Sequence, residues 1–202
     1  MKPDTMKLFP TTLRATTLRA TTLAVLATLA TFSAHADQKL LPAQSEITFV
    51  SKQMGVPVEG RFKKFDAQIA FDPTRPQTGN IAFTIDIASV TLGSPEPDAE
   101  LPKAPWFNTA KFPQATFQSS SIKGLGGGKF EVAGKLAIKG NTHDAIIPVV
   151  LTQAGATTTA SGVLTLKRLA YKIGENEWAD TAMVADDVQV KFKLALSGVG
   201  KF

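Results

Sequence analysis

Hydrophobic and polar residues alternate with a period of two along most of the chain after residue 40, which is typical of strands with one covered face. The alternation begins at Ile47 and Phe49 and is clearest between Val188 and Leu196. It covers residues 46–50, 65–71, 81–88, 115–119, 130–139, 145–151, 162–166 and 188–197. The pattern therefore predicts eight strands, each with an apolar and a polar face.

Most of these strands are separated by short turns, which indicates antiparallel neighbours. The turn signals include Asp72-Pro73, the glycine-rich residues 124–128 and Gly140-Asn141. Eight meandering strands favour an all-β, lipocalin-like, up-and-down antiparallel barrel, because closure removes exposed edges. A β-sandwich is the alternative. The outward positions carry Lys, Gln, Glu and Asp, which disfavours a barrel that faces lipid.

Two longer connections interrupt the alternation. Residues 91–113 contain five prolines around Trp106 and Phe107, and a connection of this length often marks a functional loop. We expect a short helical loop near 97–108, with a helix near 98–103, followed by an aromatic plug at the barrel mouth. Residues 168–184 contain Arg168 and Trp178. Ordinary loop packing at the rim is the alternative for both connections, and the favoured one for the second.

The N-terminus has the pattern of a cleavable secretory signal. Basic residues precede an uncharged, apolar run from Ala20 to Ala34, which ends in Ala34-His35-Ala36. The sequence thus predicts a signal peptide over residues 1–36 and an exported domain over residues 37–202. The apolar run is short for a membrane span of about 20 residues. Cleavage would leave 18 basic and 16 acidic residues, so the basic pI reflects the signal peptide.

The composition removes several kinds of chemistry. The chain has no cysteine, which excludes disulfides, thiol nucleophiles and cysteine-bound metals. After cleavage His143 is the only histidine, and it lies in the predicted turn 140–144. No catalytic triad, metal-ligand cluster, phosphate-binding loop or basic nucleic-acid stripe is evident. We therefore expect a binding protein with no catalytic residues, metal site or cofactor, and no nucleic-acid partner.

What remains is the barrel interior, where apolar side chains from every strand would meet. The period of two cannot distinguish a filled core from a hollow one, so both stay open at this point.

Several blocks of sequence resemble the YceI-like family, in the order in which that family has them. They include GRFKKF at 60–65, IDIASV at 85–90, FPQATF at 112–117 and GKLAIKGNT at 134–142. The closing block runs from RLAYKIG at 168–174 through Glu177-Trp178 to residues 184–190. Each block is weak alone, but together they cover nearly the whole exported domain. Asn141 departs from the small or β-branched apolar residue that is more usual in the family.

The resemblance implies a periplasmic, lipocalin-like barrel that binds, transports or stores a long isoprenoid lipid, of polyprenyl or quinone type. We expect the ligand to contact apolar residues at the inward positions of the predicted strands. They are Phe49, Phe83, Ile85, Phe117, Phe130, Leu136, Ile147, Val149, Val190 and Phe192, with Trp106 and Phe107 at the mouth. A polar head group of such a lipid would meet Arg168 or Lys103.

The stretch Trp178-Ala179-Asp180 looks most like the branch of the family found beside cytochrome b561-type proteins. The resemblance therefore implies an alternative function, in which the protein is an accessory partner of a membrane cytochrome and the lipid is structural. A homodimer is a further arrangement that the sequence leaves open, and an enzyme acting on the bound lipid is a third hypothesis.

Overall fold

The structure, a computed structural model, describes Met1 and residues 37–202. The predicted signal peptide lies outside the described residues apart from Met1. The strands are β1 (Lys39–Leu40), β2 (Glu46–Gln53), β3 (Val56–Phe62), β4 (Phe65–Ala70), β5 (Asn80–Asp86), β6 (Val90–Thr91), β7 (Gln114–Gly126), β8 (Lys129–Ile138), β9 (Asn141–Ala154), β10 (Thr157–Lys167) and β11 (Asp187–Ser197). The helix is α1 (Pro95–Glu100), and the 3₁₀ turns are η1 (Pro42–Gln44), η2 (Pro76–Thr78), η3 (Ile87–Ser89), η4 (Arg168–Tyr171) and η5 (Asn176–Ala179).

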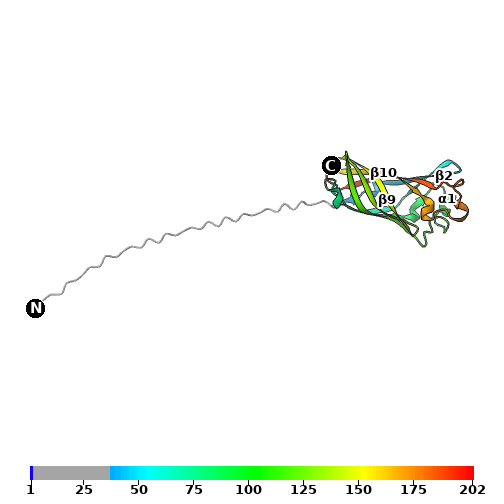
Figure 1. Ribbon diagram of the computed structural model, residues 1–202, viewed down its shortest axis with the longest axis horizontal. Coiled ribbons are helices and arrows are strands. Elements are labelled where there is room, and N and C mark those ends of the chain that lie inside the picture. Colours follow the sequence, from blue (N-terminus) through cyan, green and yellow to red (C-terminus); the bar gives the residue numbers. More distant parts are fainter. Residues whose placement is uncertain (2–36) are drawn as a thin grey trace. The chain divides into compact units, whose positions relative to one another are not determined.

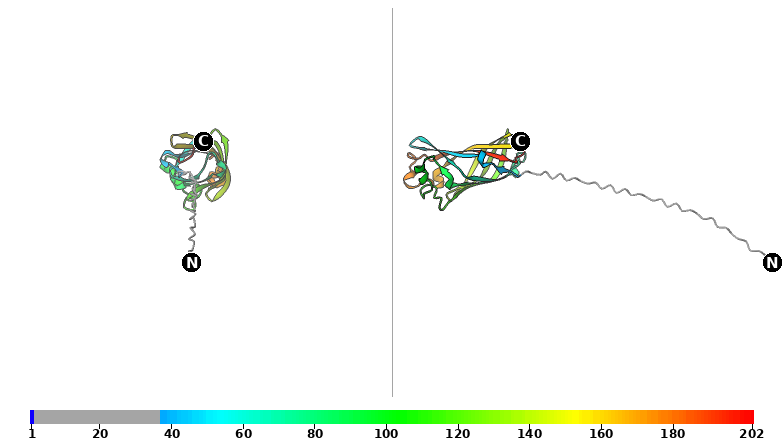
Figure 2. Two further views of the ribbon diagram at one scale, coloured as in Figure 1. Left: turned by 90° about the vertical axis from the view of Figure 1, so that its left-hand side faces the viewer. Right: turned by 180° about the vertical axis from the view of Figure 1, so that it is seen from behind.

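These strands form a closed, eight-stranded antiparallel barrel (Figure 1). Strands β1 and β2 follow one another along the same edge of β11, and β3 continues into β4, so each pair acts as one wall strand. The pairing β1–β11 together with β1–β4 closes the ring. Viewed along the barrel, the strands surround a common interior (Figure 2).

All eight predicted strands are present, and several are longer than their apolar pattern. Strand β7 extends to Gly126, beyond the alternating residues 115–119, because a register shift between Ser119 and Ser121 breaks the period. His143 lies inside β9 rather than in a turn, because the connection from β8 is only Lys139-Gly140. Both residues have positive φ, which permits this tight reversal.

Strand β3 was not predicted from the sequence. Pro57 and Gly60 resemble turn residues, yet they form part of a regular ladder with β2. Pro57 lies near the end of this ladder, where a missing backbone donor is tolerated. Gly60 lies opposite Phe49 and is buried by its ring.

The predicted short helix exists but begins earlier than expected. Helix α1 starts at Pro95 and ends at Glu100, and turns follow as far as residue 111. Proline is favourable in the first helical turn, where its missing N–H has no partner to lose. The two early prolines therefore start the helix rather than prevent it.

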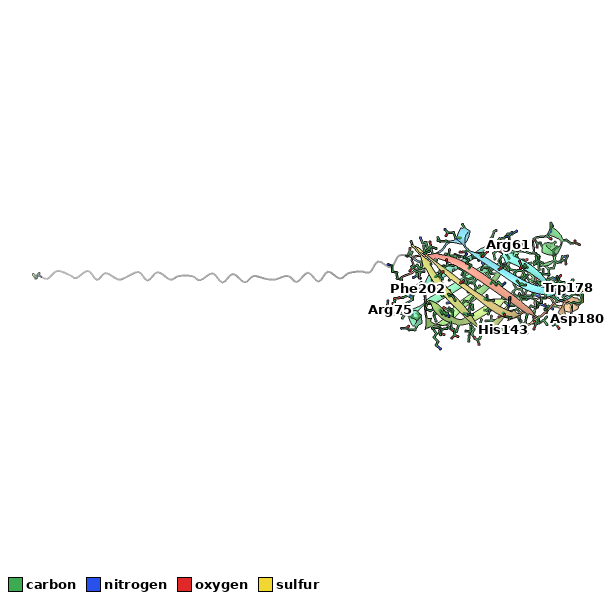
Figure 3. All side chains as sticks on the ribbon, turned by 90° about the horizontal axis from the view of Figure 1, so that it is seen from above. Arg61, Arg75, His143, Trp178, Asp180 and Phe202 are labelled. Atoms are coloured by element: carbon green, nitrogen blue, oxygen red, sulfur yellow. The ribbon has the colours of Figure 1, made fainter. Side chains whose placement is uncertain are left out.

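The loops 92–113 and 168–186 lie at one end of the barrel, and both chain ends of the described domain lie at the other. Figure 3 labels Trp178 and Asp180 at the loop-bearing end, and Phe202 and Arg75 at the opposite end. No helix among the described residues is long and apolar enough to cross a membrane.

Candidate binding cavity

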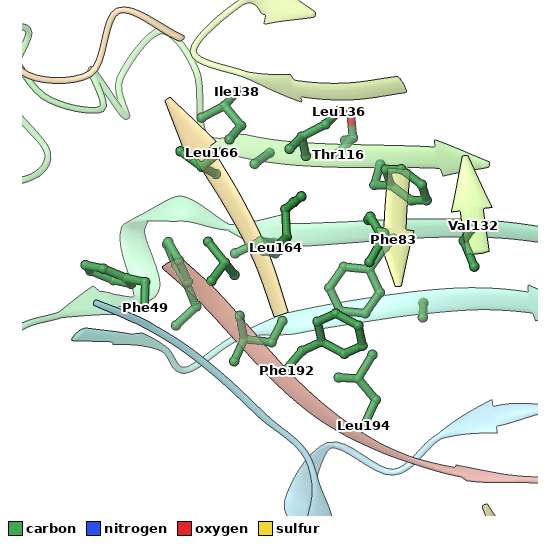
Figure 4. A pocket seen from close by; sticks show the side chains of 18 of the residues that line it. Phe49, Phe83, Thr116, Val132, Leu136, Ile138, Leu164, Leu166, Phe192 and Leu194 are labelled. Carbon is green, nitrogen blue, oxygen red and sulfur yellow. The ribbon is translucent and has the colours of Figure 1, made fainter. Parts of the chain in front are cut away.

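The barrel interior holds a cavity of about 270 Å³ (Figure 4). It runs along the barrel, since its lining includes Trp106 and Ile173 at the loop-bearing end and Leu196 and Val199 at the other. All twelve residues that the sequence nominated line this cavity. The structure adds residues of the same inward parity, among them Ile47, Phe62, Phe71, Ile81, Leu164, Leu166 and Leu194. The interior is therefore hollow, which the sequence could not decide.

The burial of the inward side chains differs between the middle of the barrel and its ends. Phe83, Leu164 and Phe192 point inward, yet they are only partly buried because they face empty space. Residues nearer the ends, such as Phe130 and Ile138, are buried. A well-packed core leaves few voids larger than a water molecule, so this interior is unlike an ordinary core.

Inward glycines keep several phenylalanine rings against the wall. A Cβ on Gly60 would lie 2.2 Å from Cζ of Phe49, and one on Gly162 would lie 2.5 Å from Cζ of Phe192. In both pairs the glycine and the phenylalanine are direct cross-strand partners. Each ring occupies the space above its glycine, where another residue would have a side chain, and so extends less far into the lumen. This arrangement preserves the cavity although eight phenylalanines line it.

The lining is almost entirely apolar. Its only polar residues within the described part of the chain are Ser51, Thr116 and Arg168. None of the lining residues is acidic or a histidine. A charged ligand group buried here would lack partners and would be costly, whereas a hydrocarbon chain would lose no hydrogen bonds.

Arg168 is buried, with 2% of its surface exposed, and its guanidinium is fully occupied by the protein itself. Nη1 donates to the carbonyls of Ile173 and Gly174, both at 2.8 Å. Nη2 donates to the carbonyls of Trp178 and Val184, and Nε donates to Ala185. These bonds use all five guanidinium N–H donors. The predicted role of Arg168 in meeting a lipid head group is therefore wrong, because no donor is free.

The Arg168 guanidinium instead organises the loop 168–186 over the barrel end. Burial lowers the pKa of Arg168, and the nearby carboxylate of Asp186 opposes this effect. Gly174 fits against the guanidinium, since a Cβ there would lie 2.4 Å from Nη1. Lys103, the other head-group candidate, is exposed, pairs with Glu100 at 2.5 Å and does not line the cavity.

A second buried cation ties the two loops of this end together. Nζ of Lys139 donates to the carbonyls of Pro105 and Lys172 and to Oε2 of Glu175. Trp106 from the first loop packs on Trp178 from the second, with ring centroids 5.4 Å apart. The predicted aromatic mouth residues Trp106 and Phe107 thus belong to a cap that is fastened to the barrel by Arg168 and Lys139.

Two titratable residues outside the cavity are explained by local structure. Nε2 of His143 lies 3.0 Å from the carbonyl oxygen of Ala170, and its ring packs edge-on against Tyr171. Burial raises the pKa of the Tyr171 hydroxyl. No group of three histidine or acidic residues that would suit a metal ion occurs in residues 37–202.

The fold and cavity define a class of protein: a small antiparallel barrel that encloses an elongated apolar chamber. The YceI-like domain family matches residues 38–196, and the chain belongs to that family. A UPF0312 protein of Vibrio cholerae is 27% identical over 157 residues, which cover 73% of this chain and 83% of that protein. A UPF0312 protein of Ectopseudomonas mendocina is 34% identical over 88 residues, and the match spans about half of its length, 46%.

Solved structures show the same fold. BcnA of Burkholderia cenocepacia is 47% identical with a TM-score of 0.75, and the match covers 77% of this chain and 98% of BcnA. A polyisoprenoid-binding domain of Saccharophagus degradans is 20% identical with a TM-score of 0.66, and the match covers 81% of this chain and 99% of that domain.

Proposed function

We propose that this protein binds a long-chain isoprenoid lipid, of polyprenyl or quinone type, inside the barrel, and that it carries or stores that lipid. The observation that carries the proposal is the elongated cavity with its nearly unbroken apolar lining. Membership of the YceI-like family and the fold shared with the polyisoprenoid-binding domain of Saccharophagus degradans support it. Such a protein is a binding protein rather than an enzyme.

The chemistry of the lining favours a chain over a compact polar ligand. Burial of each CH₂ group contributes about 0.8 kcal/mol, so ten carbons supply about 8 kcal/mol. This corresponds to about micromolar affinity before the cost of ordering the chain. Selection would then depend on the length and width of the chain, because the lining offers few polar groups to recognise a head group.

The site of action in this proposal is the periplasm. It is supported by the pattern of residues 1–36, with its basic start, apolar run and Ala-His-Ala end. Cell fractionation and N-terminal sequencing of the protein from its host test this step. A mature N-terminus at Asp37 is expected, and a full-length cytoplasmic protein would contradict it.

The alternative is a protein that serves a membrane cytochrome of the b561 type, with the lipid as a structural component. Its support is the stretch Trp178-Ala179-Asp180, which lies at the capped end of the barrel. Co-purification with a membrane haem protein would favour this alternative, and lipid exchange with vesicles would favour the carrier.

Binding is tested by titrating the protein with a polyprenol and following tryptophan fluorescence. Trp106 lines the cavity, and a Trp178→Phe background removes the second indole. Saturable quenching is expected. Phe83→Gln combined with Phe192→Gln should weaken binding at least about tenfold, because each ring contributes about 1.5–3 kcal/mol of apolar burial. Lys193→Gln on the outer face of β11 is the matched control and should bind normally. Equal affinity in all variants would contradict the proposal.

A further inference from the structure

The hydrogen-bonded ladder between β9 and β10 ends partway along the closed barrel. These strands pair only from Thr157–Ala154 to Ser161–Val150. Strand β9 nevertheless begins at Asn141, and β10 continues to Lys167. Gly162 and Pro148 still lie side by side, since a Cβ on Gly162 would be 2.2 Å from the carbonyl oxygen of Pro148. We call residues 141–147 of β9 and 163–167 of β10, beyond this contact, the seam. Each strand keeps its ladder on its other edge, β9 with β8 and β10 with β11, so the two strands diverge from one another (Figure 1).

The charged residues of the seam pair with the strands behind it and not across it. If the register of the paired part continued, Asp144 would lie opposite Lys167. Asp144 instead forms an ion pair with Lys135 on β8, and Lys167 forms one with Asp187 on β11. In both pairs the lysine Nζ lies 2.7 Å from Oδ1 of the aspartate. Asp144 and Lys167 could form an ion pair across the seam, but each is paired with a residue of the neighbouring strand on its other side. Beyond them, the contacts of His143 with Ala170 and Tyr171 bound the seam at its far end.

The part of the seam next to the paired strands carries apolar side chains on both faces. Ile146 and Val163 point outward and are 64% and 44% exposed, and Val150 beside them is 39% exposed. The alternate residues Ile147 and Leu164 line the cavity. Apolar side chains therefore lie on the outside of the barrel and on the cavity side at the same place in the wall.

Both ends of the barrel are closed by packed side chains. Arg168 and Lys139 fasten the loops over one end. At the other end a buried cluster includes Phe130 and Val199, and Phe71 packs edge-on against Phe130 at 5.2 Å between ring centroids. A long chain that passed either end would have to displace these contacts, whereas the seam requires no hydrogen-bonded ladder to open.

A lysine flanks the apolar edge on each side. Lys129 on β8 lies opposite Val150, and Lys191 on β11 lies opposite Val163. Neither lysine has an ion-pair partner among residues 37–202. Three acids lie nearby: Glu131 opposite Pro148, and Asp144 and Asp187, whose charges are offset by their ion pairs with Lys135 and Lys167. Exposed apolar side chains between cations match the surface of an anionic bilayer, where the apolar groups enter the acyl region and the lysines meet phosphates.

We propose that the seam is the membrane-facing entrance, through which the isoprenoid chain passes sideways between an anionic bilayer and the cavity. This inference rests on the proposed lipid-binding function and adds the route. It assigns to Ile146 and Val163 a role in contact with the bilayer.

The first test measures the transfer of radiolabelled polyprenol from phosphatidylethanolamine–phosphatidylglycerol vesicles to the protein. Ile146→Glu combined with Val163→Glu should slow transfer at least about tenfold, because the added charges oppose contact with anionic lipid. Gln68→Glu on β4 combined with Gln118→Glu on β7 adds the same charge at exposed positions away from the seam and should transfer at the rate of the unmodified protein. Equal slowing in both variants, or in neither, would overturn the proposal.

The second test closes the seam covalently. The chain has no cysteine, so an Ile146→Cys and Thr165→Cys pair is the only reaction site for a bifunctional maleimide. The linked protein should exchange polyprenol at least about tenfold more slowly than the unlinked one, at equal final occupancy. Unchanged exchange after linking would place the entrance elsewhere. Failure of the unmodified protein to take up polyprenol delivered from ethanol would instead show that the proposed function is wrong, and the entrance would fall with it.

Discussion

Single residues decide whether the barrel is hollow. The cavity persists beside large rings because Gly60 and Gly162 let Phe49 and Phe192 lie close to the wall. The inward phenylalanines follow from the period of two and could be predicted from the sequence. Gly162 was predicted within a strand and Gly60 was not, and neither could be matched to its phenylalanine, because the cross-strand partner of a glycine is not known from the sequence.

The change Gly162→Ala should both destabilise the barrel and narrow the cavity. The new methyl group would lie 2.2 Å from the carbonyl oxygen of Pro148 and 2.5 Å from the Phe192 ring. Overpacking of this kind costs about 1–3 kcal/mol of unfolding free energy, measurable by urea denaturation. Polyprenol affinity should fall in the same variant, since the ring can move only into the lumen.

The control for this substitution is Gly124→Ala. Its new methyl group would make an ordinary contact, at 3.4 Å from Pro76, without a positive φ. Its stability and affinity should remain close to those of the unmodified protein. Adding Phe192→Leu to Gly162→Ala should restore part of the lost stability, and failure to do so would contradict the steric explanation.

Arg168 is a structural residue, and its replacement should loosen the cap. Arg168→Lys keeps the charge but offers three donors in place of five, without the planar arrangement that reaches five carbonyls. We expect a loss of about 2–3 kcal/mol in unfolding free energy and faster amide exchange in the loop 168–186. Lys167→Gln, at the exposed neighbouring position, should change the free energy of unfolding much less, because its ion pair with Asp187 is screened by solvent. Equal stability of the Arg168 and Lys167 variants would contradict this role.

At the scale of elements, the sequence predicted strands well and connections poorly. Alternation located β11 and β8 because one face of each strand is covered along its whole length. It missed β3, whose Pro57 and Gly60 obscure the pattern. The folding of the loop 168–186 around one guanidinium could not be predicted, since the carbonyls that Arg168 binds are as far as 17 residues away. The seam was equally hidden, because it depends on the missing pairing between β9 and β10 and leaves no trace in composition.

The turn at Asp72 gives a pH-dependent contribution to stability. The carboxylate accepts hydrogen bonds from the hydroxyl and N–H of Thr74 and from Nε of Arg75, which lower the pKa of Asp72 from 3.8 to about 2. A lowered pKa in the folded state means that this contribution is present above about pH 4 and is lost as pH falls through 2. An NMR titration of the Asp72 carboxyl resonance measures the shift directly.

The matched variant is Asp72→Asn. It should be less stable than the unmodified protein at neutral pH, and the difference should shrink as pH falls from 4 toward 2. A difference that stays constant over this range would show that the turn does not depend on the charge of Asp72.

At the scale of the whole molecule, the strands form a closed barrel. Packed side chains cover both of its ends, and the pairing of β9 with β10 stops partway along its wall. The Arg168 and Lys139 cap, the packed opposite end and the apolar lining together leave a chamber suited to an elongated hydrocarbon. The YceI-like family and the fold could be recognised from the order of sequence blocks. The hollow interior could not, because the same apolar residues would equally fill a solid core.

The most direct test of the central claim is organic extraction and mass spectrometry of the protein purified without detergent from its native host. The account predicts a polyisoprenoid in a near one-to-one ratio with the protein, and its loss from the Phe83→Gln and Phe192→Gln double variant if that variant remains folded. Folded protein that yields no lipid, and takes up neither polyprenols nor quinones when these are added, would contradict the account.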